Sequence, residues 1–166
     1  EVTTVLLKKE SIEKSKQDFI VNHLKGLIFV DDLIRNNETL TEETLKDLHE
    51  IIMGDAPFGG LYRNVDISIK GSNHIPPSHL KVYDRMKKYF TSLEAISNPL
   101  EQAAFSHVQL AKIHPFLDGN GRTARLVTLY FLLKNKIKPF VFKVDEAKNY
   151  FSALEQFKVN KEIHPF

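Results

Sequence analysis

The residues best suited to chemistry stand together in one short stretch, HPFLDGNGRTAR, at positions 114–125. Its histidine, His114, has a side chain that titrates near neutral pH and can take a proton from an attacking hydroxyl. Glycines, an acid, an amide and two arginines follow within reach of the same turn. This combination predicts phosphoryl or nucleotidyl transfer at a phosphate-binding site.

The phosphate-binding part of this stretch is a helix start. We expect a helix to begin within Gly119, Asn120 and Gly121, because the first amides of a helix have no intrahelical acceptor and its dipole favours an anion there. The two glycines allow the backbone to approach a ligand closely. Arg122 and Arg125 are three residues apart, so both are predicted to clamp phosphate oxygens from the first turn.

Asp118 stands directly before this helix start. A single carboxylate beside several phosphates suits Mg²⁺, which is held in proteins by one or two carboxylates and by the substrate. A magnesium nucleotide is therefore the expected ligand.

Other patterns in the chain give weaker evidence for a functional site. The tetrapeptide IHPF returns at residues 163–166, but His164 has no anion site after it and is predicted to be incidental. The remaining histidines share no metal-ligand spacing. Residues 119–124 match a dinucleotide-binding fingerprint, with Asp145 at a suitable distance, but the preceding segment is helical and no βαβ units surround it.

Hydrophobic periodicity predicts the elements that must hold the stretch in place. A long helix is expected from a cap at Ser11 to Asn36, and a second from the Thr41 region to Gly54. A third follows the proline pair at residues 76–77, and a fourth begins at Asn98 and Pro99. The fourth must end at His114, because Pro115 disfavours helix in the residue before it. Two further helices are expected, one from residues 119–121 and one capped by Asp145.

A break in the helical period separates the second and third helices. Val65, Ile67 and Ile69 alternate with polar residues before a glycine, which predicts one arm of a short β-hairpin. The predicted fold class is therefore all-α: a single-domain helical bundle with one short β-hairpin flap. The expected parts are N-terminal helices at 11–53, the flap at about 59–77, the core helices and motif at 78–135, and a closing helix at 145–158 within one domain spanning 1–166.

Composition limits the remaining possibilities. The chain has 166 residues, of which 42% are hydrophobic and 27% charged, as expected for one globular domain. Its net charge of +2 gives no general attraction for nucleic acid or an anionic membrane, and it has no cysteine and no apolar run of membrane-spanning length. We expect a cytoplasmic protein, or one delivered into another cell's cytosol. Because the chain begins at Glu1, it is expected to be a piece of a longer protein.

The stretch at 114–125 resembles the motif H-x-F-x-[DE]-G-N-G-R-x-x-R of the Fic family, which it matches without a gap. The similarity extends less sharply over GGLYRNVDISIKGSNHIPP, which resembles the family's flap, and KNYFSALEQF, which resembles its closing helix. The resemblance implies a helical Fic fold with a β-hairpin flap. It also implies transfer of AMP from magnesium-ATP to a Ser, Thr or Tyr hydroxyl of a target protein, with release of pyrophosphate.

The resemblance assigns roles to individual residues. His114 would be the general base, Asp118 would hold Mg²⁺, and Arg122 and Arg125 would pair with phosphate oxygens. Gly119, Asn120 and Gly121 would form the phosphate cradle. The other assignments are for the flap, which would dock an extended target segment through Ile67, Ser68, Ile69, Lys70 and Gly71, and for the base pocket, formed by Asn149 and Tyr150.

Many Fic proteins carry an inhibitory [ST]-x-x-x-E-[GN] element whose glutamate pairs with the second motif arginine, here Arg125. No match occurs, so such an element is expected on a separate antitoxin-like protein, outside this chain, or in an altered form. Neither nucleic acid nor a membrane is an expected partner. Two other function classes remain open at this point: another phosphoryl, nucleotidyl or phosphodiester transferase on the same scaffold, and a non-catalytic nucleotide-binding regulatory module.

Overall fold

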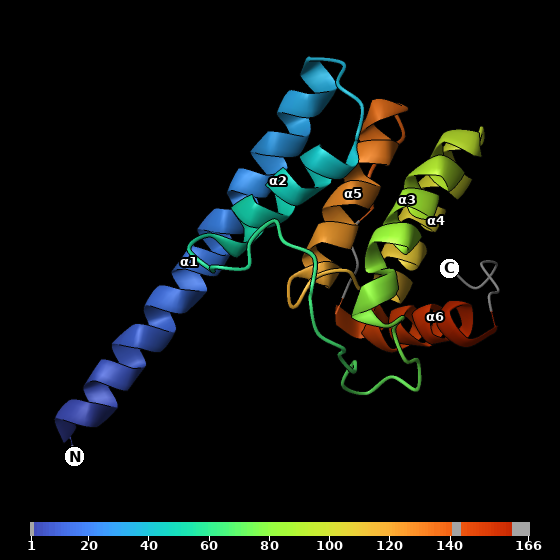
Figure 1. Ribbon diagram of the computed structural model, residues 1–166. Coiled ribbons are helices and arrows are strands. Elements are labelled where there is room, and N and C mark those ends of the chain that lie inside the picture. Colours follow the sequence, from blue (N-terminus) through green and yellow to red (C-terminus); the bar gives the residue numbers. More distant parts are fainter. Residues whose placement is uncertain (1, 141–143, 161–166) are drawn as a thin grey trace.

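The chain folds as a bundle of α-helices (Figure 1). The computed structural model describes the backbone of residues 2–140 and 144–160, with the side chains of residues 16–140 and 145–158. In these ranges the helices are α1 (Val2–Arg35), α2 (Glu42–Met53), α3 (Val82–Ala95), α4 (Pro99–Ile113), α5 (Asn120–Lys134) and α6 (Ala147–Asn160), with two short 3-10 helices, η1 (His79–Lys81) and η2 (Val144–Glu146). The expected all-α class is confirmed.

Local sequence sets most of the helix ends as predicted. Thr41 caps α2 by a reciprocal pair of hydrogen bonds, in which Thr44 N donates to Thr41 Oγ1 at 3.2 Å and Thr41 N donates to Thr44 Oγ1 at 2.8 Å. Asn98 Oδ1 accepts from Leu100 N at 3.0 Å and caps α4, whose first residue is Pro99. These caps fix where α2 and α4 begin.

The predicted start of the first helix was wrong. α1 begins at Val2 rather than after a cap at Ser11. The preceding residues include leucine, lysine and glutamate, which favour helix, and neither glycine nor proline stands among them. A single serine does not stop such a helix.

The predicted β-hairpin is replaced by an extended loop. In the part of the chain that is described, residues 61–78 form bends and a turn but no strand. Pro76 and Pro77 lack amide hydrogens, so the returning arm has two fewer donors for a ladder. Loop atoms bond elsewhere instead: Arg63 N donates to Pro115 O at 2.8 Å, and Asn73 N donates to a carboxylate oxygen of Glu155 at 2.7 Å.

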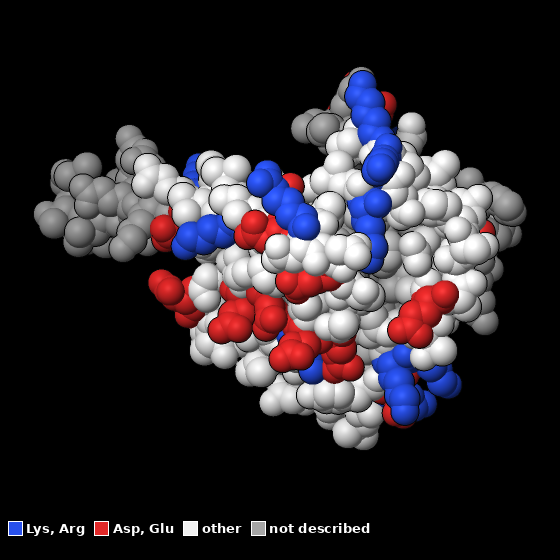
Figure 2. Space-filling view, turned by 90° about the horizontal axis from the view of Figure 1, so that it is seen from above, with Lys and Arg blue, Asp and Glu red and all other residues white. Residues whose placement is uncertain are grey.

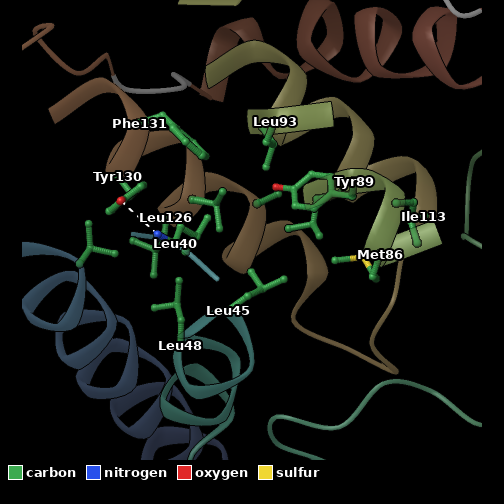
Figure 3. Packing of buried hydrophobic residues seen from close by; sticks show 14 of the residues in the cluster. Leu40, Leu45, Leu48, Met86, Tyr89, Leu93, Ile113, Leu126, Tyr130 and Phe131 are labelled. Carbon is green, nitrogen blue, oxygen red and sulfur yellow. Dashed lines mark hydrogen bonds between the residues drawn. The ribbon is translucent and has the colours of Figure 1, made fainter. Parts of the chain in front are cut away.

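α5 lies at the centre of the bundle, where it packs against α4, α1 and α2. α3 covers α4 on the other side, and α6 crosses one end of α4 (Figure 1). The helices bury one main apolar core, whose close packing is drawn in Figure 3. Its largest fully buried members include Tyr89, Tyr130, Phe116, Leu45, Leu48, Ile52, Met86 and Leu110.

The surface carries charges of both signs. Figure 2 shows a group of acidic side chains beside separate basic ones on one face of the molecule. Among the helices described, none is both long enough and apolar enough to span a bilayer.

A buried tyrosine joins the end of α5 to the segment between α1 and α2. The Tyr130 hydroxyl donates to Glu38 O at 2.8 Å and accepts from Leu40 N at 3.1 Å, a bond drawn in Figure 3. It also accepts from Lys134 Nζ at 2.8 Å. The hydroxyl therefore satisfies two backbone groups of a connecting segment that has no ladder of its own.

We expect Tyr130→Phe to lower the free energy of unfolding by about 1 to 3 kcal/mol, because the buried Leu40 amide loses its acceptor. Urea denaturation would measure the change. Tyr83→Phe is the matched control: Tyr83 is 62% exposed, and removal of its hydroxyl should cost less than about 0.5 kcal/mol. Equal losses in the two variants would contradict the assigned role of Tyr130.

Candidate functional site

A pocket of about 450 Å³ opens where α4 ends and α5 begins, between the loop turn at 69–72 and α6. It brings together four residues that the sequence predicted as site residues, His114, Gly121, Arg125 and Tyr150. Three predicted flap residues, Ile69, Lys70 and Gly71, also line it. Residues from three distant parts of the sequence therefore share one cavity.

His114 ends α4 in a conformation that fixes its ring. Its backbone lies in the left-handed region, with φ of 51° and ψ of 60°, which residues other than glycine rarely adopt. Its ring Nδ1 lies 3.3 Å from Ala111 O. A carbonyl oxygen can only accept, so Nδ1 carries the hydrogen and Nε2 is left with a free lone pair. The ring is thus arranged to accept a proton at Nε2.

The environment of His114 also keeps its ring neutral. The pKa of His114 is lowered to about 4, mainly by burial and to a smaller extent by the positive charges of Lys158 and Arg63, while the hydrogen bond to the Ala111 carbonyl acts in the opposite direction. Because this pKa lies below the ordinary value of 6.5, the imidazole is unprotonated at neutral pH. His114 can therefore act as a base without first losing a proton.

α5 begins at Asn120, within the residues 119–121 where the sequence predicted a helix start. The first intrahelical bond runs from Thr123 N to Gly119 O at 3.0 Å, so the amides of Asn120, Gly121 and Arg122 precede it. The Asn120 side chain has a different role. It is 2% exposed and closes the motif loop on itself, because Asn120 Oδ1 accepts from Phe116 N at 3.0 Å and Asn120 Nδ2 donates to Phe116 O at 2.8 Å. Any contact of Asn120 with phosphate must come from its backbone.

Gly119 is required by the packing beneath the loop. Its φ is 75°, and a Cβ atom there would lie 2.7 Å from Met53 Sδ and 3.1 Å from His49 Nε2. The His49 ring stacks on Phe116 with 3.6 Å between ring centroids, and it donates from Nε2 to Asp118 O at 2.9 Å. His49 comes from α2 and is fully buried.

The two motif arginines point in different directions, contrary to the predicted joint clamp. Arg125 lines the pocket with His114. Arg122 instead donates from Nη1 to Ile52 O at 3.2 Å, and its guanidinium lies 4.8 Å from the centroid of the Phe19 ring. The last carbonyls of α2 lack intrahelical donors and carry the negative end of its dipole, which attracts the guanidinium.

Asp118 lies at the edge of this arrangement. Its side chain is 72% exposed, with Oδ2 3.6 Å from Arg122 Nη2. Its Oδ1 accepts from Gly119 N at 2.6 Å, so the carboxylate is fixed at the start of α5. One carboxylate held in this way is accessible to a cation that brings further ligands.

The flap turn is fastened to α6 and α4. Glu155 accepts from Ser72 Oγ at 2.6 Å and from Asn73 N at 2.7 Å. His74 Nε2 donates to Lys112 O at 2.8 Å. The loop turn that lines the pocket is therefore held in place without strand pairing.

Of the two residues predicted for the base pocket, only one lines the cavity. Tyr150 lines the cavity, whereas Asn149 is exposed and does not. Phe151 lines the same cavity, is 64% exposed and meets Tyr150 edge to face, with 5.0 Å between ring centroids. Sequence reasoning missed Phe151, although its position next to Tyr150 in a predicted helix was an available signal.

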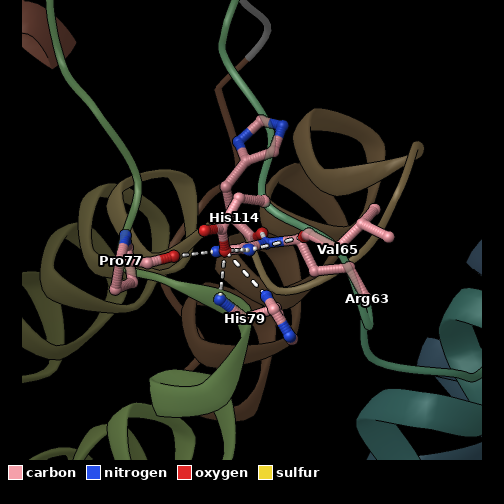
Figure 4. Close-up of polar contacts among 6 residues, drawn as sticks. Arg63, Val65, Pro77, His79 and His114 are labelled. Atoms are coloured by element: carbon pink, nitrogen blue, oxygen red, sulfur yellow. Dashed lines mark hydrogen bonds and ion pairs between the residues drawn. The ribbon is translucent and has the colours of Figure 1, made fainter.

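Sequence reasoning also missed Arg63, which organises the loops around the pocket (Figure 4). Its side chain is buried, and it donates from Nε to His114 O at 2.9 Å and from Nη1 to Val65 O at 3.0 Å. Its Nη2 donates to Pro77 O. One guanidinium thus joins the end of α4 to both ends of the flap. No pattern around Arg63 distinguishes it from an exposed arginine.

The geometry is accompanied by a clear similarity to known proteins. A family model described as the Fic/DOC family matches residues 39–132. The protein adenylyltransferase Fic of Nematostella vectensis is 33% identical over 140 residues, which make up 81% of this chain and 32% of that protein. The relative of the same name from Culex quinquefasciatus is 31% identical over 140 residues, 81% of this chain and 27% of that protein. The chain spans less than one third of these curated relatives.

Solved structures agree with the fold. Fic-1 from C. elegans, residues 134–508, superposes with a TM-score of 0.77 at 23% identity, covering 90% of this chain and 46% of that one. A Fic domain containing signaling protein from Bacteroides thetaiotaomicron gives a TM-score of 0.74 at 26% identity, covering 86% and 57% of the two chains. The helical arrangement around the pocket is therefore shared with solved Fic structures.

We expect Arg63→Lys to lower the free energy of unfolding by about 3 kcal/mol, because one ammonium cannot reach all the carbonyls that the guanidinium joins. Urea denaturation would measure this loss. Arg85→Lys is the matched control at an exposed position of α3 and should change stability by less than about 0.5 kcal/mol. A wild-type stability for Arg63→Lys would show that these bonds do not hold the loops together.

Proposed function

The chain belongs to the Fic/DOC family, and from this premise we propose that it transfers AMP from ATP to a hydroxyl side chain of a target protein and releases pyrophosphate. The observation that carries the proposal is the placement of a neutral His114 in the same pocket as the first turn of α5. A base and an anion site then lie side by side, as transfer of a phosphate-linked group requires.

The reaction follows from the tautomer of His114. The target hydroxyl would give its proton to Nε2, and its oxygen would form a bond to the α-phosphorus of ATP. The bond between that phosphorus and the oxygen bridging to the β-phosphate would break, so that pyrophosphate leaves with the electron pair. Arg125 and the amides of Asn120, Gly121 and Arg122 would balance the negative charge on the phosphates.

Magnesium fits the single carboxylate at this site. Across the ranges described, no group of three or more His, Asp or Glu side chains could hold a metal alone. Asp118 would therefore supply the protein ligand and the nucleotide phosphates would supply others. Bound magnesium would offset phosphate charge. Arg122, which lies 3.6 Å from Asp118, would help to orient the carboxylate.

The flap would present the target. Ile69, Lys70 and Gly71 line the pocket, and Lys70 and Gly71 are exposed. An extended target segment could pair with this backbone by strand addition and bring its hydroxyl to His114. Glu155 accepts hydrogen bonds from Ser72 and Asn73, and would thereby keep the flap backbone at a fixed distance from His114.

We propose that the target protein is cytosolic. We also propose that an inhibitory protein or segment would act at Arg125.

AMP transfer can be tested with ATP labelled at either the α- or the γ-phosphate, incubated with magnesium and a cell lysate. We expect label on protein from the α-position alone, and a loss of about 100-fold or more in His114→Ala, since a general base contributes about 10² to 10⁴ in rate. His164→Ala, which alters the second IHPF tetrapeptide, is the matched control and should retain activity. Labelling from the γ-position would instead indicate phosphoryl transfer and overturn the proposal.

The acid limb of the pH–activity profile should lie at a much lower pH than it would for a base with the ordinary pKa of histidine. With a pKa of about 4, His114 remains a neutral base at about pH 5.5, and kcat/KM for the target should be nearly the same there as at about pH 7.5. An ordinary histidine would lose about tenfold over this interval. Lys158→Met should move the acid limb to higher pH, because Lys158 lowers this pKa. A tenfold fall in the wild type would contradict the buried, neutral base.

A further inference from the structure

A buried histidine outside the family motif joins α4, α5 and α6. His107 is fully buried in α4, with Nδ1 2.9 Å from Thr128 Oγ1 and Nε2 2.9 Å from the Tyr150 hydroxyl. The rings of His107 and Tyr150 meet edge to face, with 5.7 Å between ring centroids. The proposed reaction uses none of these contacts. Burial of a polar group is costly unless the group is hydrogen-bonded, and a fully satisfied buried network fixes the geometry of its members.

The direction of these hydrogen bonds follows from the donors available. The Thr128 hydroxyl donates to Ala124 O at 2.8 Å, so its oxygen can accept from His107 Nδ1–H. The Ala124 carbonyl also lies within hydrogen-bonding contact of the His107 ring, and a carbonyl can only accept. Burial lowers the pKa of His107 to about 3, so the ring is neutral and Nε2 has no hydrogen. Nε2 must then accept from the Tyr150 O–H.

Tyr150 extends this chain of hydrogen bonds toward the motif, with the same direction of donation. Its only hydroxyl hydrogen is used by His107, so its oxygen presents lone pairs to other donors. Burial raises the pKa of Tyr150, and the Arg125 guanidinium acts on this hydroxyl from the pocket side in the opposite direction, through its charge and a side-chain hydrogen bond. Arg125 and Tyr150 line the same pocket as His114 and Gly121. The chain of donors therefore runs from Arg125 through Tyr150 and His107 to Thr128, and it begins and ends on α5.

We propose that His107 and Tyr150 are positioning residues that hold the Arg125 guanidinium over the phosphate site through this directional hydrogen-bond chain. The inference rests on the proposed function, since it assumes that phosphates bind beside Arg125. Arg125 is exposed and has many rotamers, so a fixed acceptor on its flank reduces the conformational entropy that phosphate binding must overcome. α6 thereby contributes to phosphate binding without touching a phosphate.

The alternative is that Tyr150 only forms a wall of the base pocket. The two roles differ in the ligand that they affect. A wall contact would act on adenosine and ATP alike, whereas a positioned guanidinium acts on ATP alone, because adenosine has no phosphate. Binding measurements with both ligands therefore separate the roles without any requirement for AMP transfer.

The test is calorimetric titration of magnesium-ATP, and competition by adenosine, with the wild type, Tyr150→Phe and His107→Phe. We expect Tyr150→Phe to weaken ATP binding about tenfold, as for the loss of a hydrogen bond to a charged group, and to leave adenosine binding unchanged. His107→Phe should weaken ATP binding in the same direction, by about threefold. Tyr83→Phe, at an exposed position of α3, is the matched control and should bind both ligands as the wild type does.

A double-mutant cycle with Arg125→Ala decides whether the effect passes through Arg125. In that background Tyr150→Phe should change ATP affinity by less than about twofold, because the group it positions has gone. Thr128→Val, which removes the acceptor for His107 Nδ1–H, provides a second route if a ring variant fails to fold. Equal losses for ATP and adenosine, or additive losses in the cycle, would overturn the inference. A wild type that binds no ATP would count instead against the proposed function.

Discussion

The buried Arg63 guanidinium is the contact on which the geometry of the pocket depends. It donates to backbone carbonyls of His114, Val65 and Pro77, which belong to segments with no ladder or helix to connect them. The nearest carboxylate oxygen, in Asp66, is 3.9 Å away on a side chain that is 66% exposed. The buried charge is therefore satisfied mainly by carbonyls, and moving any of these loops would leave part of it without partners.

The hydrogen bond from Arg63 affects the proposed base through the backbone of His114. Arg63 holds the His114 carbonyl while the residue adopts a left-handed conformation, and the ring then turns back to donate to Ala111 O. Burial in that position lowers the pKa of the ring, which lines the pocket and has its Nδ1 engaged by Ala111 O. One arrangement thus fixes the tautomer, the protonation state and the direction of the proposed base, at the cost of an unfavourable φ.

α5 connects the remaining parts of the site because its faces have different neighbours. Its first turn offers free amides to the pocket, while Arg122 leaves this turn toward the end of α2 and Arg125 toward α6. One turn later, Thr128 accepts from His107 within the interior. A helix that is buried on several sides can in this way hold the proposed phosphate site at its start and take part in the interior hydrogen bonds from its middle.

Local sequence determined the helices, their caps and the motif, because capping, proline geometry and apolar periodicity act between residues a few positions apart. Thr41, Asn98 and the junction at His114 were predictable for this reason. The flap loop, the separation of the two motif arginines and the roles of Arg63 and His107 were not predictable. Each depends on atoms 14 or more residues away in the chain, such as the Pro77 carbonyl for Arg63, the Ile52 carbonyl for Arg122 and the Glu155 carboxylate for the flap. Only packing of the helices brings such partners within hydrogen-bonding distance, so the tertiary structure decided how the residues of the motif are used.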